Sequence, residues 1–192
     1  GDIDMNPVCT INRRILVIDD SPNILEDFRK ILRPAGSFIS DEYSEFKQDL
    51  LDETFLHCDK EPFDLDCVDN GMSGCDLVKQ AKLCGSPFAM AFLDVRLPNG
   101  WDGIETVERI WDEDPGVQVV LCTAYPDLGW SEVLIRLGHR DQLAILRKPF
   151  DPIEVWQLST ALTMKWHWTQ QAQLRVQDLE EIVTNRTAQL KE

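Results

Sequence analysis

The amino-acid sequence predicts an α/β fold, a doubly wound sheet of five parallel strands followed by an extended C-terminal helix. The first reason is that strand-like apolar runs alternate with segments of helical periodicity, as they do in successive βαβ units. The second reason is that four of these runs end on reactive polar residues, namely the runs over residues 14–20, 88–94, 117–123 and 143–149. The carboxyl ends of parallel strands meet in one crevice, so these polar side chains are expected to gather around a single point.

The first βα unit follows residues 1–12, a polar and unpatterned segment that we exclude from the fold as disordered or as a tag remnant. After the first apolar run, Ser21 and Pro22 suit the N-cap and the first turn of a helix. Apolar residues at helical spacing continue to Leu32, so this helix is expected to end near Pro34.

An acidic insertion is expected over about residues 34–62, between the first helix and a second strand over residues 63–68. Residues 41–69 hold 11 acidic residues and 2 lysines, which gives this stretch a net charge of −9. Apolar residues recur at helical intervals over roughly 41–56 and favour a short amphipathic helix there. An extended first helix or a solvated loop would explain the same pattern, and an acidic docking face for a partner is the functional alternative.

Each of the remaining strands is followed by a helical pattern. One helix is expected over residues 72–83. Asp102 and Glu105 have the spacing of a capping box and begin the next helix. The apolar stripe of that helix consists of Ile104, Val107, Ile110 and Trp111. Further helices are expected around residues 130–137 and from Asp151 onward.

The helical pattern does not stop at Met164 but continues to the end of the chain. Four apolar residues there fall on a 3-4 spacing, namely Val176, Leu179, Val183 and Leu190. Arg186 occupies one further position of this series. This spacing is typical of a short coiled coil, although a single amphipathic helix would show it too. The sequence therefore divides into a domain over residues 13–163 and a helical or coiled-coil linker over residues 164–192.

Composition argues against several kinds of partner. The 192 residues carry a formal net charge of −15, which would repel the phosphates of nucleic acids. No stretch is long and apolar enough to cross a bilayer, and the first residues lack a signal-peptide pattern, so a cytoplasmic protein is expected. The six cysteines show no CxxC spacing and are expected to be mostly free core thiols. A zinc site at His57, Cys58 and Cys67 has no recognised ligand spacing and is not predicted.

The polar residues at the strand ends resemble, in type and order, the motif of two-component response regulator receiver domains, and they are Asp19, Asp20, Asp94, Thr123 and the pair Lys148-Pro149. The resemblance extends over residues 13–163 apart from the insertion. It implies a flavodoxin-like sheet with strand order 2-1-3-4-5 and a cis bond before Pro149. It also implies that Asp94 accepts a phosphoryl group from a histidine kinase or a phosphotransfer protein. The C-terminal helix would then pass the signal to a downstream output domain in the same chain.

The same resemblance implies a Mg²⁺ site whose protein ligands are Asp19, Asp20, Asp94 and the backbone carbonyl of Arg96. Asp20 and Asp94 would bind the ion directly, and Asp19 would bind it mainly through water. Mg²⁺ prefers oxygen ligands and retains several waters, so an open cluster of carboxylates suits it. Thr123 and Lys148 would bind phosphoryl oxygens, where positive charge is needed because an anionic carboxylate attacks an anionic phosphoryl group.

Some positions are expected to tune the reaction or its output. Arg96 and Tyr125 lie two residues after Asp94 and Thr123, at receiver positions that flank the path of the hydrolytic water. Ile145 stands three residues before the lysine, where receivers often carry an aromatic switch residue. The output domain is not visible, but a diguanylate cyclase, a phosphodiesterase or a histidine kinase would suit such a linker.

Two other functions compete with this interpretation. The segment Asp64-Leu-Asp66-Cys-Val68 fits the DxDxV pattern of haloacid-dehalogenase-like phosphatases, which are Mg²⁺-dependent enzymes with an aspartyl-phosphate intermediate. Pro62 argues against a buried central strand before it. The other hypothesis is a receiver kept as a dimerisation scaffold without phosphotransfer, with a homodimer through the C-terminal helix. The sequence favours a signalling receiver rather than an enzyme.

Overall fold

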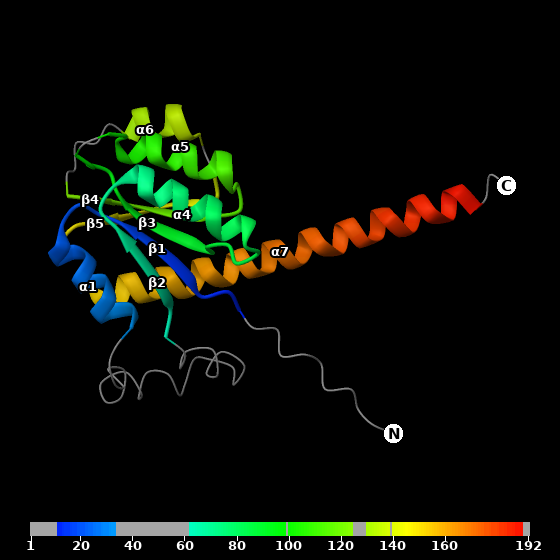
Figure 1. The fold of residues 1–192 in the computed structure, drawn as a ribbon, viewed down its shortest axis with the longest axis horizontal. Coiled ribbons are helices and arrows are strands. Elements are labelled where there is room, and N and C mark those ends of the chain that lie inside the picture. The colour runs from blue at the N-terminus through cyan, green and yellow to red at the C-terminus, as the bar shows by residue number, and fades with distance from the viewer. Residues whose placement is uncertain (1–10, 34–61, 99, 125–129, 139, 190–192) are drawn as a thin grey trace, which may run out of the picture.

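The computed structural model describes residues 11–33, 62–98, 100–124, 130–138 and 140–189. Strands and helices alternate along these residues as predicted (Figure 1). The strands are β1 (Arg14–Ile18), β2 (Asp64–Val68), β3 (Met90–Asp94), β4 (Gln118–Thr123) and β5 (Leu143–Arg147). The helices are α1 (Pro22–Leu32), α4 (Gly71–Leu83), α5 (Gly103–Glu113), α6 (Trp130–Leu137) and α7 (Pro152–Gln189).

The five strands form one parallel sheet in the order β2-β1-β3-β4-β5, which confirms the predicted topology. Helices α1 and α7 cover one face, and α4, α5 and α6 cover the other (Figure 1). A parallel sheet covered on both faces needs strands that are apolar on both sides. The central strands meet this need, since every residue of β4 and the run Ile15–Ile18 in β1 are buried.

Helices pack on the sheet through the apolar stripes that the sequence indicates. The stripe of α5 is buried as predicted, and the Trp111 indole also donates a hydrogen bond to the Val117 carbonyl oxygen. On the other face, the Phe28 ring of α1 lies 4.7 Å from the Phe92 ring and 5.1 Å from the Phe150 ring, between centroids. Each large apolar side chain buried in this way contributes roughly 1.5–3 kcal/mol, so both faces hold the sheet.

Side-chain capping follows the prediction at one helix start and departs from it at another. The Asp102 carboxylate accepts a hydrogen bond from the Glu105 N–H, as the capping-box spacing indicates. Ser21 occupies the N-cap position of α1, but its side chain makes no capping hydrogen bond. Instead its backbone N–H donates to the Asp19 carboxylate. The predicted N-cap position of Ser21 and first-turn position of Pro22 are therefore confirmed, but the Ser21 side chain does not supply the capping bond.

The two ends of the insertion are fastened to each other. The Phe63 N–H donates to the Leu32 carbonyl oxygen, and the Arg33 guanidinium donates to the Phe63 carbonyl oxygen and to the Asp64 carboxylate. The short helix predicted over residues 41–56 lies outside the described residues.

At the N-terminal side, Asn12 accepts a hydrogen bond from the Arg14 N–H and donates one to the Pro87 carbonyl oxygen, so it already belongs to the folded body.

Helix α7 is continuous over 38 residues and runs far beyond the sheet (Figure 1). Its first half packs on the body, where Val155, Ser159, Thr163 and His167 are buried. From Ala172 to Arg186 every residue is exposed. None of the helices that the structure describes has the length and apolar character needed to cross a membrane.

Candidate functional site

Four strands bring their C-terminal polar residues to one edge of the sheet. Asp19 follows β1, and Asp94 and Thr123 are the last residues of β3 and β4. Lys148 follows β5 directly. Because β1, β3, β4 and β5 are neighbours and all run parallel, residues up to 129 positions apart in sequence come within hydrogen-bonding distance. This is the crevice that the sequence predicts.

The Lys148 ammonium joins two of the carboxylates. Its Nζ atom lies 2.6 Å from Asp19 Oδ2 and 3.0 Å from Asp94 Oδ2. The side chains of Lys148 and Asp94 are each 15% exposed and that of Asp19 is 2% exposed, so the pairs are largely shielded from water. The Lys148 N–H donates to the Thr123 carbonyl oxygen, and the Lys148-Pro149 bond is cis as the family resemblance implies.

The backbone after Asp94 is held by its neighbours. The Arg96 N–H donates to Asp94 Oδ1 at 3.2 Å, and the Val95 N–H donates to the Cys122 carbonyl oxygen. Gly103, at the start of α5, donates its N–H to the Val95 carbonyl oxygen. A Cβ atom on Gly103 would lie 2.4 Å from the Asp94 carbonyl oxygen and 2.6 Å from Val95 Cα. Only glycine lets α5 approach this closely, a contact that the sequence analysis missed.

Burial and charge set the protonation of the cluster. Burial raises the pKa of Asp19 above its ordinary value, against the opposing effect of the hydrogen bond from Lys148. For Lys148, burial alone would lower the pKa, but the hydrogen bonds to Asp19 and Asp94 outweigh it and raise the pKa. Lys148 therefore remains an ammonium group at neutral pH. Burial also raises the pKa of the Cys122 thiol to about 12, so this neighbour of the crevice is not a thiolate at neutral pH.

Three carboxylates could hold a cation. Oxygen atoms of Asp19, Asp20 and Asp94 all lie within 4.8 Å of one another. Asp20 is exposed, Asp94 is half-buried and Asp19 is buried, so the cluster opens to solvent on one side. Mg²⁺ fits this donor set, because it takes oxygen ligands and keeps waters on its open side. With a single ammonium among them, ionised carboxylates leave a negative balance that a divalent cation would relieve.

The other predicted residues surround this cluster with different exposure. Thr123 is buried at the end of β4, whereas Arg96 and Pro149 are exposed. Ile145 in β5 is 36% exposed. Tyr125 lies outside the described residues.

The competing phosphatase motif lies elsewhere. Asp64 and Asp66 are the first and the middle residue of the edge strand β2, and neither lies at its carboxyl end. Arg14 pairs with both carboxylates, at 3.4 Å and 2.9 Å, and Arg33 pairs with Asp64 at 2.7 Å. These acids have the role of surface ion-pair partners, and they do not face the crevice.

The cysteines follow the prediction in part. Cys75 and Cys122 are buried, Cys67 is half-buried, and all the cysteines that the structure describes are free thiols. Cys84 is exposed and lies outside the core that was expected for most of the cysteines. It lies at the C-cap of α4. His57 and Cys58 lie outside the described residues.

Comparison with known sequences gives two findings. A family model described as a response regulator receiver domain matches residues 48–159. This range contains Asp94, Thr123 and Lys148 but begins after Asp19 and Asp20. The chain is also 31% identical, over 106 residues, to the sporulation initiation phosphotransferase F of Bacillus subtilis (strain 168). That match covers 55% of this chain and 76% of the relative.

Comparison with solved structures shows the same fold. An adenylate cyclase structure from Rhodopirellula baltica superposes with a TM-score of 0.62 at 18% identity, over 86% of this chain and 98% of the other. The signal receiver domain of an HD domain-containing protein from Pseudomonas fluorescens Pf-5 has a TM-score of 0.62 at 20% identity, over 88% and 98% of the two chains. At such identities the likeness concerns the arrangement of strands and helices.

Proposed function

Because the chain belongs to the response regulator receiver domain family, we propose that it accepts a phosphoryl group on Asp94 from the phosphohistidine of a partner protein. The observation that carries this proposal is the double contact of Lys148 with Asp19 and Asp94 at the open edge of the sheet. It sets a nucleophilic carboxylate beside a fixed positive charge in an acidic crevice.

In the proposed reaction, an Asp94 carboxylate oxygen forms a bond to phosphorus while the phosphorus–nitrogen bond to the donor imidazole breaks. The imidazole nitrogen leaves with the electron pair of that bond. Negative charge on the phosphoryl oxygens is met by the Lys148 ammonium, which must exchange part of its contact with Asp94 for the arriving group. The Thr123 hydroxyl would donate to another phosphoryl oxygen. The backbone contacts of Asp94 keep the nucleophile in place, which favours direct attack.

Asp20 and Asp94 would hold Mg²⁺ directly, with Asp19 acting through water and the Arg96 carbonyl as a further ligand. When bound, the ion would supply positive charge for the phosphoryl oxygens at a site that otherwise carries excess negative charge. The spacing of the three carboxylates and the exposure of Asp20 support this assignment. Arg96 and Tyr125 would influence how long the acyl phosphate survives.

The signal would leave through α7. Phosphorylation would shift a two-state equilibrium of the surface formed by α6, β5 and α7, with Ile145 in the place of the usual aromatic switch. The chain is a signalling domain in this proposal, and catalysis would belong to an output domain in the same chain. A diguanylate cyclase, a phosphodiesterase or a histidine kinase is the output that we expect, without direct nucleic-acid or membrane contact and in the cytoplasm.

The proposed partners are thus a histidine kinase or phosphotransfer protein, the output domain and, through α7, a second copy of the chain. A relative described as a phosphotransferase supports the first of these. The exposed C-terminal part of α7 supports the last. It also keeps a dimerisation scaffold without phosphotransfer as the second candidate function.

We expect one added phosphoryl group per chain after incubation with acetyl phosphate or phosphoramidate and Mg²⁺, measured as intact mass. The adduct should require Mg²⁺ and be absent from Asp94→Asn, because this change removes the nucleophilic oxygen. Asp66→Asn is the matched control, since Asp66 is also a strand carboxylate but lies outside the crevice. It should be phosphorylated like the wild type.

An adduct that persists in Asp94→Asn would move the acceptor to another residue. No adduct on the wild type, tested also for binding of beryllofluoride as a stable mimic of the acyl phosphate, would favour the scaffold function instead.

A further inference from the structure

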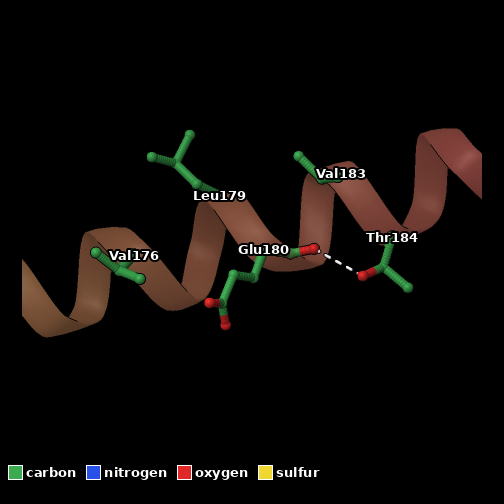
Figure 2. A pocket seen from close by; sticks show the side chains of 5 residues that line it. All are labelled: Val176, Leu179, Glu180, Val183 and Thr184. Atoms are coloured by element: carbon green, nitrogen blue, oxygen red, sulfur yellow. Dashed lines mark hydrogen bonds between the residues drawn. The ribbon is translucent and has the colours of Figure 1, made fainter.

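A stripe of apolar side chains follows one side of the C-terminal part of α7. Val176, Leu179 and Val183 are 53%, 61% and 63% exposed. Figure 2 shows them along the helix, with Glu180 and Thr184 beside them, and these five residues line a shallow surface pocket. We call these three apolar residues the α7 stripe. Large aliphatic side chains exposed in a row, one turn apart, are unusual on a helix that remains in water.

The α7 stripe lies on the side of the helix opposite to the body. Thr163 is 1% exposed and marks the face that packs on the sheet. Counted from Thr163 at 3.6 residues per turn, the stripe residues lie roughly 160–220° further around the helix axis. A partner helix placed on the stripe would therefore not collide with the body on which this α7 packs. Two copies could join there with their bodies on the outer sides.

The spacing of the stripe defines heptad positions. Val176 and Val183 take position a, and Leu179 takes position d. Arg175 then takes position g, and Glu180 takes position e, and both are exposed. In a parallel two-stranded coiled coil, a g residue faces the e residue five positions further along the other chain. Arg175 therefore faces Glu180 of the partner subunit, and by symmetry the pair forms twice.

We propose that a second copy of this chain docks on the α7 stripe as a parallel, in-register coiled coil that the two Arg175–Glu180 pairs orient. An antiparallel pair would set e residues against e residues and g residues against g residues. Arg175 would then never face Glu180, and the charges would give no attraction. The charge pattern thus selects a second copy in the parallel orientation. This inference deepens the proposed α7 partnership and does not depend on phosphotransfer.

The proposed α7 dimer is expected to be weak. The stripe spans eight residues, little more than one heptad, which is short for a stable coiled coil. Arg186 follows at the next d position, where it would face the same residue of the partner subunit. Such a seam favours a dimer that forms and separates with concentration, so a second contact elsewhere could tip the balance.

Two leucines give a matched pair for the test. Leu179 lies on the stripe and is 61% exposed, while Leu174 is 54% exposed but lies about 20° from Thr163 around the axis, on the opposite side. We expect the full chain to dimerise with concentration in sedimentation velocity. Leu179→Asp should weaken dimerisation at least about tenfold, since it buries a charge in the seam. Leu174→Asp should leave the dimer unchanged.

Charge reversal tests the orientation. Arg175→Glu and Glu180→Arg should each weaken the homodimer by about tenfold, because both place like charges at the two g–e sites. Mixing the two variants should restore association, since each site in the mixed dimer then joins one glutamate and one arginine. An antiparallel pair would already set like charges against each other in the wild type, so neither single variant would be weaker than the wild type. The parallel register therefore requires both results: loss in each single variant and recovery on mixing.

The proposal is overturned by a wild-type chain that stays monomeric at every concentration tested, or by equal loss in both leucine variants. Recovery that fails on mixing overturns the parallel register. The measurements are made on unphosphorylated chain and repeated in Asp94→Asn, so a failure of phosphotransfer leaves them readable. Conversely, Leu179→Asp should still form the acyl phosphate, because no residue of the crevice lies on the stripe.

Discussion

At the scale of single residues, Asp19 is a carboxylate whose burial opposes its charge. It is 2% exposed, accepts hydrogen bonds from the Ser21 N–H and from Lys148, and stands near Asp94. Burial still raises its pKa. A carboxyl with a raised pKa in the folded state favours folding while protonated and costs stability once ionised. This destabilisation by ionised Asp19 arises in the carboxylate cluster, where a bound cation would offset it.

We expect Asp19→Asn to raise the melting temperature of the metal-free protein at pH 7 by roughly 2–4 °C, the shift that about 1 kcal/mol produces in a chain of this size. The sign follows from linkage. In the wild type the Asp19 contribution falls as pH rises from the ordinary value of 3.8 through the raised folded value, and Asn cannot titrate. Calorimetry between pH 3 and 8 should show a less negative slope for the variant.

Mg²⁺ provides the control for this experiment. Added ion should raise the melting temperature of the wild type, because it binds the folded state alone. The gain should shrink in Asp19→Asn. A variant that is less stable than the wild type without metal would show that the contact with Lys148 outweighs the burial of charge.

Gly103 is the second residue whose place is set by the crevice. Any side chain there would meet the backbone of Asp94 and Val95, which cannot move aside like the end of a flexible side chain. We expect Gly103→Ala to cost about 3 kcal/mol of folding free energy. It should also slow phosphorylation by at least about tenfold, because the loop that carries the nucleophile must shift. Urea denaturation and intact-mass time courses would measure the two effects.

Asp102→Ala is the matched control for Gly103→Ala. It removes the cap of the same helix and should cost about 1 kcal/mol. Because the Asp102 side chain bonds to Glu105 rather than to the Asp94 loop, phosphorylation should keep its rate. An equal slowing in both variants would mean that loss of stability, and not the position of Asp94, limits the reaction.

At the scale of elements, the insertion between α1 and β2 enters and leaves the body at one point. Arg33 and Phe63 are hydrogen-bonded across its base, and the Phe63 N–H also bonds to Leu32. The strand β2 pairs in register with β1 directly after that base. The register of the sheet is therefore set by contacts that do not pass through the inserted residues.

We expect a chain in which residues 35–61 are replaced by a short Gly-Ser turn to keep the fold. Shortening a closed loop by this much should stabilise the body by about 1–2 kcal/mol through loop-closure entropy. Thermal melting would measure the change, and phosphorylation by acetyl phosphate should persist at the wild-type rate. Transfer from a histidine kinase is the comparison that isolates docking: loss of that transfer alone would assign the insertion to partner recognition.

If the shortened chain instead melts well below the wild type, the inserted residues contribute packing to the body. A Gly-Ser turn of twice the length serves as control for strain at the new junction.

The elements could be predicted from the sequence where a single kind of interaction determines the structure. Continuous apolar runs predicted the buried strands, since a sheet covered on both faces admits little else. The sharing of Lys148 between two acids was also foreseeable, because parallel topology fixes which strand ends meet. The Ser21 turn and the exposure of Cys84 were not, since they depend on which of several partners a group meets in space. The close approach of Gly103 to the backbone of Asp94 and Val95 could be suspected only from the pair Asp102-Gly103. A glycine at such a position has many other possible roles.

At the scale of the whole molecule, the chain consists of a compact body and a helix that outgrows it. All residues from 172 to 186 are exposed, so they contribute little packing to the body. We expect truncation after Gln171 to leave the melting temperature of the monomer within about 2 °C of the full chain, because a surface helix end far from the core adds little stability. The same truncation should abolish dimerisation in sedimentation velocity.

A control for the truncation is a cut within the packed half of α7. Ending the chain after Thr160 removes Thr163 and His167, which are buried against the body, and should lower the melting temperature strongly. A large loss of stability from the cut after Gln171 would contradict the division of α7 into a packed and an exposed part.

The length of α7 has a mechanical consequence. Between Gln171, where the helix leaves the body, and Gln189, where the described helix ends, a rise of 1.5 Å per residue gives an arm of about 27 Å. A tilt of about 10° in the packed half would carry the far end of such an arm about 5 Å, which is close to one helical turn. A stiff helix of this length would act as a lever that magnifies small changes of angle in its packed half. For a given tilt, the displacement of the far end is proportional to the length of the arm. Shortening the arm by whole turns would therefore reduce this displacement in proportion and leave its direction unchanged.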